Sequence, residues 1–151
     1  MTDTFNVHTF VERVEPRQLD AAAISAAKGQ LQQIGGEPIT GVAIDRHSHP
    51  DGKYNFTSIV AQKQGGGEVV IDHDANGKVS VSNFNVDKRP TFTVHNRNGT
   101  GVWQGTDFTG AYQSSLSKPE TDAIGQAAAN ALTQLGLSVP PARIPRPSLQ
   151  P

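Results

Sequence analysis

Two histidines and two aspartates lie close together between two apolar segments of the chain: Asp45, His47, His49 and Asp51. On an extended segment, alternate residues point to the same side, so His47 and His49 can present imidazole nitrogens to one ion such as Zn²⁺. A catalytic zinc ion usually has three protein ligands and an open position, and His73 is the candidate for the third ligand. The spacing raises the hypothesis of a small metal site, with a plain polar loop as the alternative.

A second group of candidate metal ligands lies in the segment DHDANG, residues 72–77, which matches the first half of a calcium-binding loop. Asp72, Asp74 and Asn76 would supply hard oxygen ligands at alternate positions, and a glycine would make the sharp turn. The match ends there, because Asn83 stands where a calcium loop has a bidentate glutamate. The same residues suit a hairpin turn, in which Asp and Asn side chains bond to their own backbone. The sequence favours the turn over a calcium site.

Three aromatic residues, Trp103, Phe108 and Tyr112, are spaced through a segment rich in glycine and threonine, GTGVWQGTDFTGAY. Tryptophan and tyrosine carry much of the binding energy at protein interfaces. The segment therefore predicts a surface that binds another protein. The alternative is that the rings cap the open edge of a sheet and close its core.

The composition excludes several classes of function. The chain has 151 residues and no cysteine, which excludes disulfides, cysteine-based zinc sites and thiol nucleophiles. A formal net charge of -1 with scattered Lys and Arg residues provides neither a basic nucleic-acid-binding surface nor a polybasic membrane patch. No nucleophile elbow, phosphate-binding glycine loop or HExxH motif is present. We expect neither nucleic acid nor membrane as a partner, and no cofactor apart from the zinc or calcium considered above.

The N-terminal residues and the apolar segments indicate where in the cell the protein is expected. At the N-terminus, no basic segment precedes an apolar one, so a secretory signal peptide is not expected. No run approaches the roughly 20 apolar residues that a membrane-spanning helix needs. A cytoplasmic location is the default expectation.

Residues 65–86, GGGEVVIDHDANGKVSVSNFNV, carry the strongest signal for the fold. Val69 and Ile71 alternate with outward-facing positions in one segment, and Val79 and Val81 do so in the next. This period of two is typical of strands with one buried face. Asp74-Ala75-Asn76-Gly77 between them supplies residues that tolerate the positive φ of a tight reversal. The segment therefore predicts a β-hairpin.

Further strands and two helices flank this hairpin. The residues predict a short strand around Asn6 to Val14, a helix from about Arg17 to Ile34, strands Ile39 to Asp45, Tyr54 to Lys63 and Thr91 to His95, an irregular or edge-like stretch from Val102 to Tyr112, and a helix from Ser117 that Gly136 stops.

This order predicts an α+β fold: a helix, an antiparallel β-meander of four to five strands, and a C-terminal helix packed on one face of the sheet. We divide the chain into an N-terminal arm or edge strand over residues 1–15, a single α+β domain over residues 16–138, and a Pro-rich extended tail over residues 139–151.

Four local patterns follow one another between residues 21 and 81. They are a helix over Ile24 to Ile34, the strand end Val42-Ala43-Ile44-Asp45, the strand start Gly52-Lys53-Tyr54-Asn55-Phe56, and Val70-Ile71-Asp72 followed by Gly77-Lys78-Val79. Together they resemble the PepSY domain, a small bacterial module. PepSY domains are usually exported or attached to membranes, and are thought to restrain peptidases or bind partners. The resemblance implies a role in binding.

Two hypotheses of function follow from these observations. The first is a non-enzymatic protein-interaction module, such as an inhibitor, an immunity or adaptor protein, or an accessory protein of a bacterial or phage system. It rests on the lack of catalytic motifs in the sequence and on the aromatic segment. The second is a small metal-binding protein or metal-dependent enzyme that uses the loop with His47 and His49.

Overall fold

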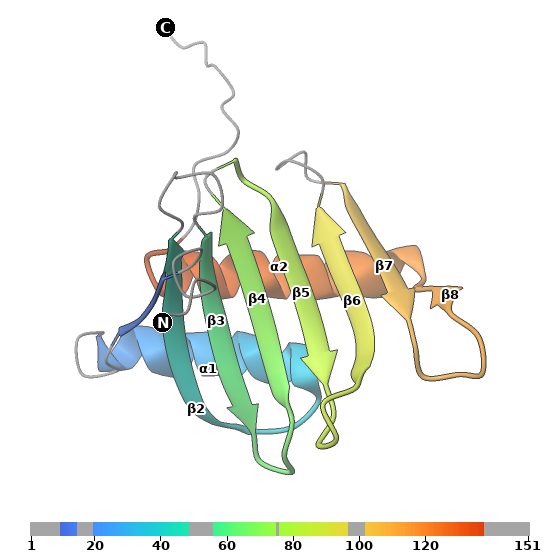
Figure 1. Ribbon diagram of the computed structural model, residues 1–151, viewed down its shortest axis with the longest axis horizontal. Coiled ribbons are helices and arrows are strands. Elements are labelled where there is room, and N and C mark those ends of the chain that lie inside the picture. Colours follow the sequence, from blue (N-terminus) through green and yellow to red (C-terminus); the bar gives the residue numbers. More distant parts are fainter. Residues whose placement is uncertain (1–9, 15–19, 49–55, 75, 97–101, 138–151) are drawn as a thin grey trace, which may run out of the picture.

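One antiparallel sheet and two helices make up the described part of the chain (Figure 1). The computed structural model describes residues 10–14, 20–48, 56–74, 76–96 and 102–137. The strands are β1 (Phe10–Val14), β2 (Ile39–Ser48), β3 (Phe56–Lys63), β4 (Glu68–Asp74), β5 (Val79–Phe84), β6 (Pro90–Asn96), β7 (Trp103–Asp107) and β8 (Ser114–Ser115), and the helices are α1 (Ala21–Gly35) and α2 (Lys118–Gln134). The predicted α+β class is confirmed.

The strands lie in the sheet in the order of the sequence, and each is antiparallel to its neighbours. Residues directly opposite one another share a face of the sheet. One such cross-strand row is almost fully buried and forms the centre of the core: Ile44, Ile59, Ile71, Val81 and Val94. The predicted hairpin is confirmed as β4 and β5, and Gly77 takes a φ of 86° in its turn.

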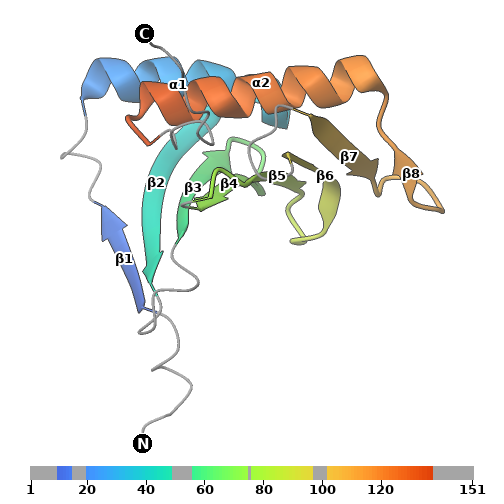
Figure 2. The same cartoon turned by 90° about the horizontal axis from the view of Figure 1, so that it is seen from above.

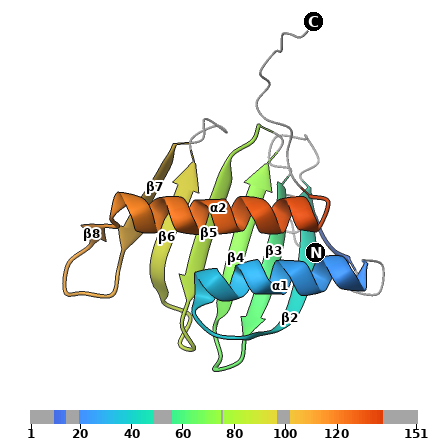
Figure 3. The ribbon, with the colours of Figure 1, turned by 180° about the vertical axis from the view of Figure 1, so that it is seen from behind.

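Both helices pack on the same face of the sheet and run antiparallel to each other (Figure 3). The side chain of Asp20 caps the start of α1, and Gly36 ends it with a φ of 79°. α2 begins with a capping box, formed by Ser117 and Glu120. α1 contacts β2, β3 and β4, and α2 contacts β5, β6 and β7. Together the helices cover one face of the sheet.

The prediction of four to five strands is wrong, because the sheet formed by the described residues has eight. The stretch predicted to be irregular or edge-like contains the regular strand β7, and β8 follows it. Gly105 weakens the strand signal of β7. A Cβ atom at Gly105 would lie 2.7 Å from Leu116 Cδ1 and 3.2 Å from Thr121 Oγ1. The close approach of α2 to β7 therefore requires the glycine that hides the strand.

A buried lysine ties the end of α1 to the sheet. The Lys63 ammonium donates to Asn83 Oδ1 at 3.0 Å and lies 4.0 Å from Glu37 Oε2. Asn83 Nδ2 donates in turn to Thr91 Oγ1 at 2.8 Å. A buried charge is tolerated when it is paired and hydrogen-bonded. This network joins β3, β5 and β6 beneath the first helix.

No described element packs on the face of the sheet opposite the helices (Figure 2). β1 and the outer half of β2 bend away from the helices, so the sheet curls toward this side (Figure 2). We call this surface the uncovered face. It presents the strand residues that alternate with those of the core.

Candidate functional site on the uncovered face

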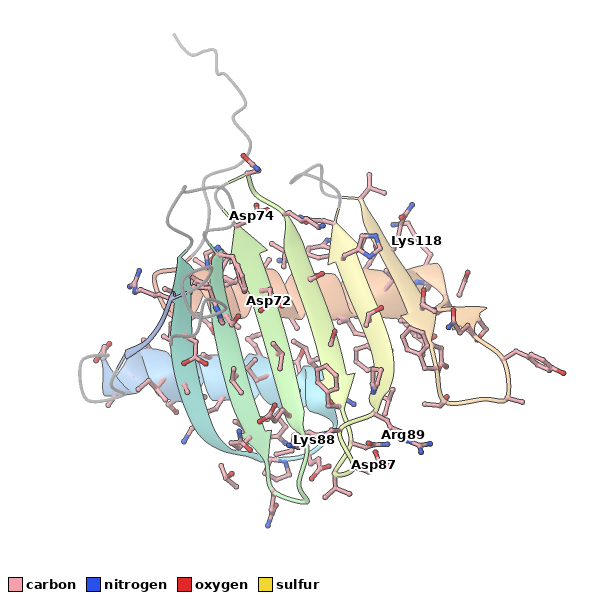
Figure 4. All side chains as sticks on the ribbon, in the orientation of Figure 1. Asp72, Asp74, Asp87, Lys88, Arg89 and Lys118 are labelled. Carbon is pink, nitrogen blue, oxygen red and sulfur yellow. The ribbon has the colours of Figure 1, made fainter. Side chains whose placement is uncertain are left out.

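A polar cross-strand row lies at the end of the uncovered face formed by β2, β3 and β4. Asp45 is opposite Ser58, and Ser58 is opposite Asp72. The next row contains His47 and Phe56. These residues alternate with Ile44, Ile59 and Ile71 of the core, so the pleat of the strands turns them away from the helices. Asp72 and the adjacent Asp74 are labelled on β4 in Figure 4.

Hydrogen bonds join three side chains of this region, which we call the His47–Ser58–Asp72 cluster. The Ser58 hydroxyl donates to Asp72 Oδ1, and Ser58 Oγ lies 3.2 Å from His47 Nε2. Because Ser58 has only one hydroxyl proton, His47 Nε2 is the donor toward it. The imidazole also stacks on Phe56, with ring centroids 4.1 Å apart and planes 5° from parallel. The cluster is therefore held from three adjacent strands.

The order of the three side chains decides what chemistry the cluster supports. In a Ser-His-Asp triad the histidine stands between the serine and the aspartate and removes the serine proton. Here Ser58 stands in the middle and gives its proton directly to the Asp72 carboxylate. Ser58 is also only 4% exposed. This arrangement does not favour Ser58 as a nucleophile. It favours a structural role, in which Ser58 holds the His47 imidazole and the Asp72 carboxylate in place.

Sequence reasoning missed Ser58 as a member of the site. The signal was present in the register: the β3–β4 and β4–β5 hairpins fix which residues are opposite, and Ser58 faces Asp72. His47 reaches Ser58 because β2 pairs with the other edge of β3. Serine carries no motif of its own, so only the alignment of three strands reveals the cluster.

The structure does not bring together the residues of the zinc hypothesis that it describes. His47 lies on the uncovered face, whereas His73 is opposite Thr57 and Val79 on the helix side. His49 and Asp51 lie outside the described residues. Within residues 10–14, 20–48, 56–74, 76–96 and 102–137, no group of three His, Cys, Asp or Glu residues is placed to hold a metal ion.

The residues of the calcium hypothesis make the contacts of a hairpin turn. Asp74 Oδ1 accepts from the backbone N–H of Asn76 at 2.8 Å and from that of Lys78 at 3.0 Å. Asp72 bonds to Ser58 instead, and Asn76 is exposed. One Asp74 oxygen thus closes the β4–β5 connection, in the way that the sequence favoured.

The three aromatic residues of the predicted partner surface lie in different environments. Trp103 is opposite the buried Asn96 on the helix side, and its indole packs against Gly125 of α2. Phe108 is half-buried, and Tyr112 is 87% exposed. The hydroxyl and N–H of Thr109 donate to Asp107, which holds the pKa of that carboxyl below its ordinary value. Of the three rings, Tyr112 alone is fully presented to solvent.

The helices of the described residues include none that is long and apolar enough to cross a membrane. Comparison with known proteins adds no relative to this picture. No protein-family model matches the chain, and neither a curated protein nor a solved structure matches it.

Proposed function

We propose that this chain is a non-enzymatic protein-interaction module that binds a partner protein across the uncovered face. The observation that carries the proposal is the placement of both helices on one side of the sheet (Figure 2). The opposite side is a broad surface of adjacent strands with no described element upon it. This curved sheet face is a continuous surface that a partner protein can contact.

Short side chains form the middle of this surface. One cross-strand row over six strands contains only alanine, valine, serine and threonine: Ala43, Val60, Val70, Ser82, Thr93 and Thr106. All six residues are partly exposed. Short, largely β-branched side chains have little rotamer freedom to lose, so a partner can pack closely at a low entropic cost. This row is the centre of the proposed interface.

The charge of the face indicates the chemistry of the partner. Glu68, Asp72 and Asp74 occupy its β4 part, and the described residues of β2 to β7 that point to this face include no Lys or Arg, whereas Arg13 of β1 is opposite Asp45 in the register. Complementary charge steers association and sets specificity. We therefore infer that the partner presents lysine or arginine side chains to the carboxylates beside the His47–Ser58–Asp72 cluster.

An inhibitor, an immunity or adaptor protein, and an accessory protein of a bacterial or phage system all fit this description. The central position of Ser58 between His47 and Asp72 supports a function without catalysis. The resemblance of residues 21–81 to the PepSY domain stays a prediction, and it would make the partner a peptidase. The metal hypothesis also stays a prediction, with His47 as its described ligand.

Photo-crosslinking identifies the partner and its contact face in one experiment. A photoreactive phenylalanine analogue replaces Val70 at the centre of the uncovered face, and a matched chain carries it at the exposed Ala123 of α2. We expect the Val70 chain, and not the Ala123 chain, to form a specific crosslinked product in the source cells. Mass spectrometry of the product then names the partner.

Binding of the purified partner completes the test. Val70→Arg places a bulky cation in the row of short side chains, and we expect the affinity to fall at least about tenfold. Ala123→Arg adds the same charge behind the sheet and should leave the affinity unchanged. Added salt should weaken the wild-type complex. Equal crosslinking from both positions, or unchanged binding by Val70→Arg, contradicts the proposal.

A further inference from the structure

We propose that His73 is an acid-sensitive latch between the sheet and the helix layer, which opens the helix side of the molecule when the imidazole takes up a proton. This inference concerns the face behind the proposed interface and does not depend on what binds there. It rests on the burial of the ring, its lack of partners, and the charges around it.

His73 is buried on the helix side of β4, where it is 8% exposed. Among the residues that the structure describes, neither Nδ1 nor Nε2 has a hydrogen-bond partner, and both atoms are inaccessible to solvent. Buried polar groups in folded proteins are nearly always paired. A neutral imidazole already leaves one N–H donor unsatisfied here, and an imidazolium would leave two. The folded state therefore strongly prefers the neutral ring.

The charged residues near His73 do not remove this preference. Burial is the main influence and lowers the pKa of His73 below its ordinary value of 6.5. Asp74 and Asp72 raise the pKa, and Arg46 lowers it. These two carboxylates flank His73 in sequence, at the upper end of β4 (Figure 4), but the pleat turns them to the opposite face.

Few ionisable side chains lie on the described elements around His73. Of the two helices, α1 contacts β4, and its one ionisable side chain is Lys28. α2 runs across the upper halves of the strands (Figure 3) and contacts β5, the neighbour of β4. From Ala123 to Gln134 this helix has no ionisable side chain, and β5 has none either. On β3, the ionisable residue is Lys63, at the far end of the strand from Thr57, which pairs with His73. A proton on His73 gains solvation only when water reaches the ring.

The direction of the pH effect follows from linkage. The pKa of His73 is lower in the folded state than in the unfolded state, so the unfolded chain binds more protons between the two values. The full stabilisation is present above pH 6.5. It is lost progressively as the pH falls below 6.5 toward the folded-state pKa. Mild acid therefore favours states in which the ring is exposed.

Trp103 is a built-in reporter of this opening. It is the single tryptophan of the chain, and it lies in the same cross-strand row as His73, reached through Val79 and Asn96. Its indole packs against Gly125 of α2. Separation of the helix from the sheet would expose the indole to water and shift its emission to the red.

The test compares wild type with His73→Leu between about pH 7.5 and about pH 5. We expect the wild-type urea midpoint to fall with pH and the Trp103 emission to shift to the red before global unfolding. His73→Leu should flatten both responses, because it removes the titrating group and the unsatisfied donor. His95→Gln changes a histidine on the uncovered face and should keep the wild-type pH response.

A second measurement needs no variant. In the wild-type chain, an NMR titration of the assigned His73 ring should give a pKa below 6.5. A His73 pKa at or above that value overturns the latch, whether or not His73→Leu folds. A pH response retained by a folded His73→Leu chain, or a wild-type stability that does not change with pH, overturns it as well.

Discussion

At Ser58, one hydroxyl joins side chains from three strands. It donates to Asp72 and accepts from His47, so both of its hydrogen-bonding functions are satisfied. Ser58 is also buried, unlike the other polar residues in its row. Removing one partner of a buried hydrogen bond costs more than the bond itself contributes, because the remaining group stays desolvated. The cluster therefore supports the stability of the sheet as well as the chemistry of its surface.

Ser58→Ala measures this contribution. We expect the free energy of unfolding to fall by about 1–3 kcal/mol in urea titrations, because Asp72 and His47 both lose their partner. Ser80→Ala is the matched control, since Ser80 pairs with Asp72 from the other side and is only half-buried. It should change stability by less than about 0.5 kcal/mol. A Ser58→Ala chain as stable as Ser80→Ala contradicts the hydrogen bonding of the cluster.

Among the elements, α2 and β7 approach each other most closely at Gly125. A Cβ atom there would overlap the indole of Trp103, so the absence of a side chain sets the distance between helix and sheet. Gly29 in α1 is different, because a Cβ atom at that position would meet nothing within 4 Å. Both glycines lie inside helices, yet only one is required by packing.

Gly125→Ala and Gly29→Ala should therefore have opposite effects. We expect Gly125→Ala to lower the free energy of unfolding by about 1–3 kcal/mol through overpacking, and to alter the Trp103 emission. Gly29→Ala should raise it by about 0.5–1 kcal/mol, because alanine is the better helix former. Chemical denaturation followed by circular dichroism measures both changes. A stabilised Gly125→Ala chain would show that α2 does not lie against Trp103.

The elements that sequence could predict are those whose signal is local. β4 and β5 alternate strictly, and their turn carries Gly77, so the hairpin was evident from residues alone. α2 has a capping box and an apolar stripe. β7 was not evident, because Gly105 serves packing against Leu116 at the expense of strand propensity. A residue type that a long-range contact requires, such as Gly105, leaves no secondary-structure pattern in the sequence around it.

Prediction of the candidate site would have required knowledge of contacts between residues still farther apart in the sequence. His47 and Asp72 were each visible as candidate ligands, but in separate hypotheses. Their connection through Ser58 depends on the register of three strands. The opposite placement of His47 and His73 depends on the same register, since a shift of one residue would reverse the faces. Residue types suggested the chemistry, and only the pairing of the strands assigned it to a face.

The whole molecule is two-sided: the helix layer holds the core, and the other face of the sheet carries carboxylates, hydroxyls and short apolar side chains. We predict a separate property for each face. Acid sensitivity should depend on His73 on the helix side, and the partner should bind to the uncovered face. Val70→Arg and His73→Leu should therefore affect different measurements, provided that each variant folds.

Carboxyl-group footprinting of the complex with the partner found by crosslinking shows which side of the sheet the partner covers. A carbodiimide-coupled label reports the accessibility of individual Asp and Glu side chains with and without the partner. We predict that Glu68 and Asp74 on the uncovered face become protected, whereas Glu120 at the start of α2 labels equally in both states. Protection of Glu120 with continued labelling of Glu68 and Asp74 would show instead that the partner occupies the helix side, and the proposed interface would be wrong.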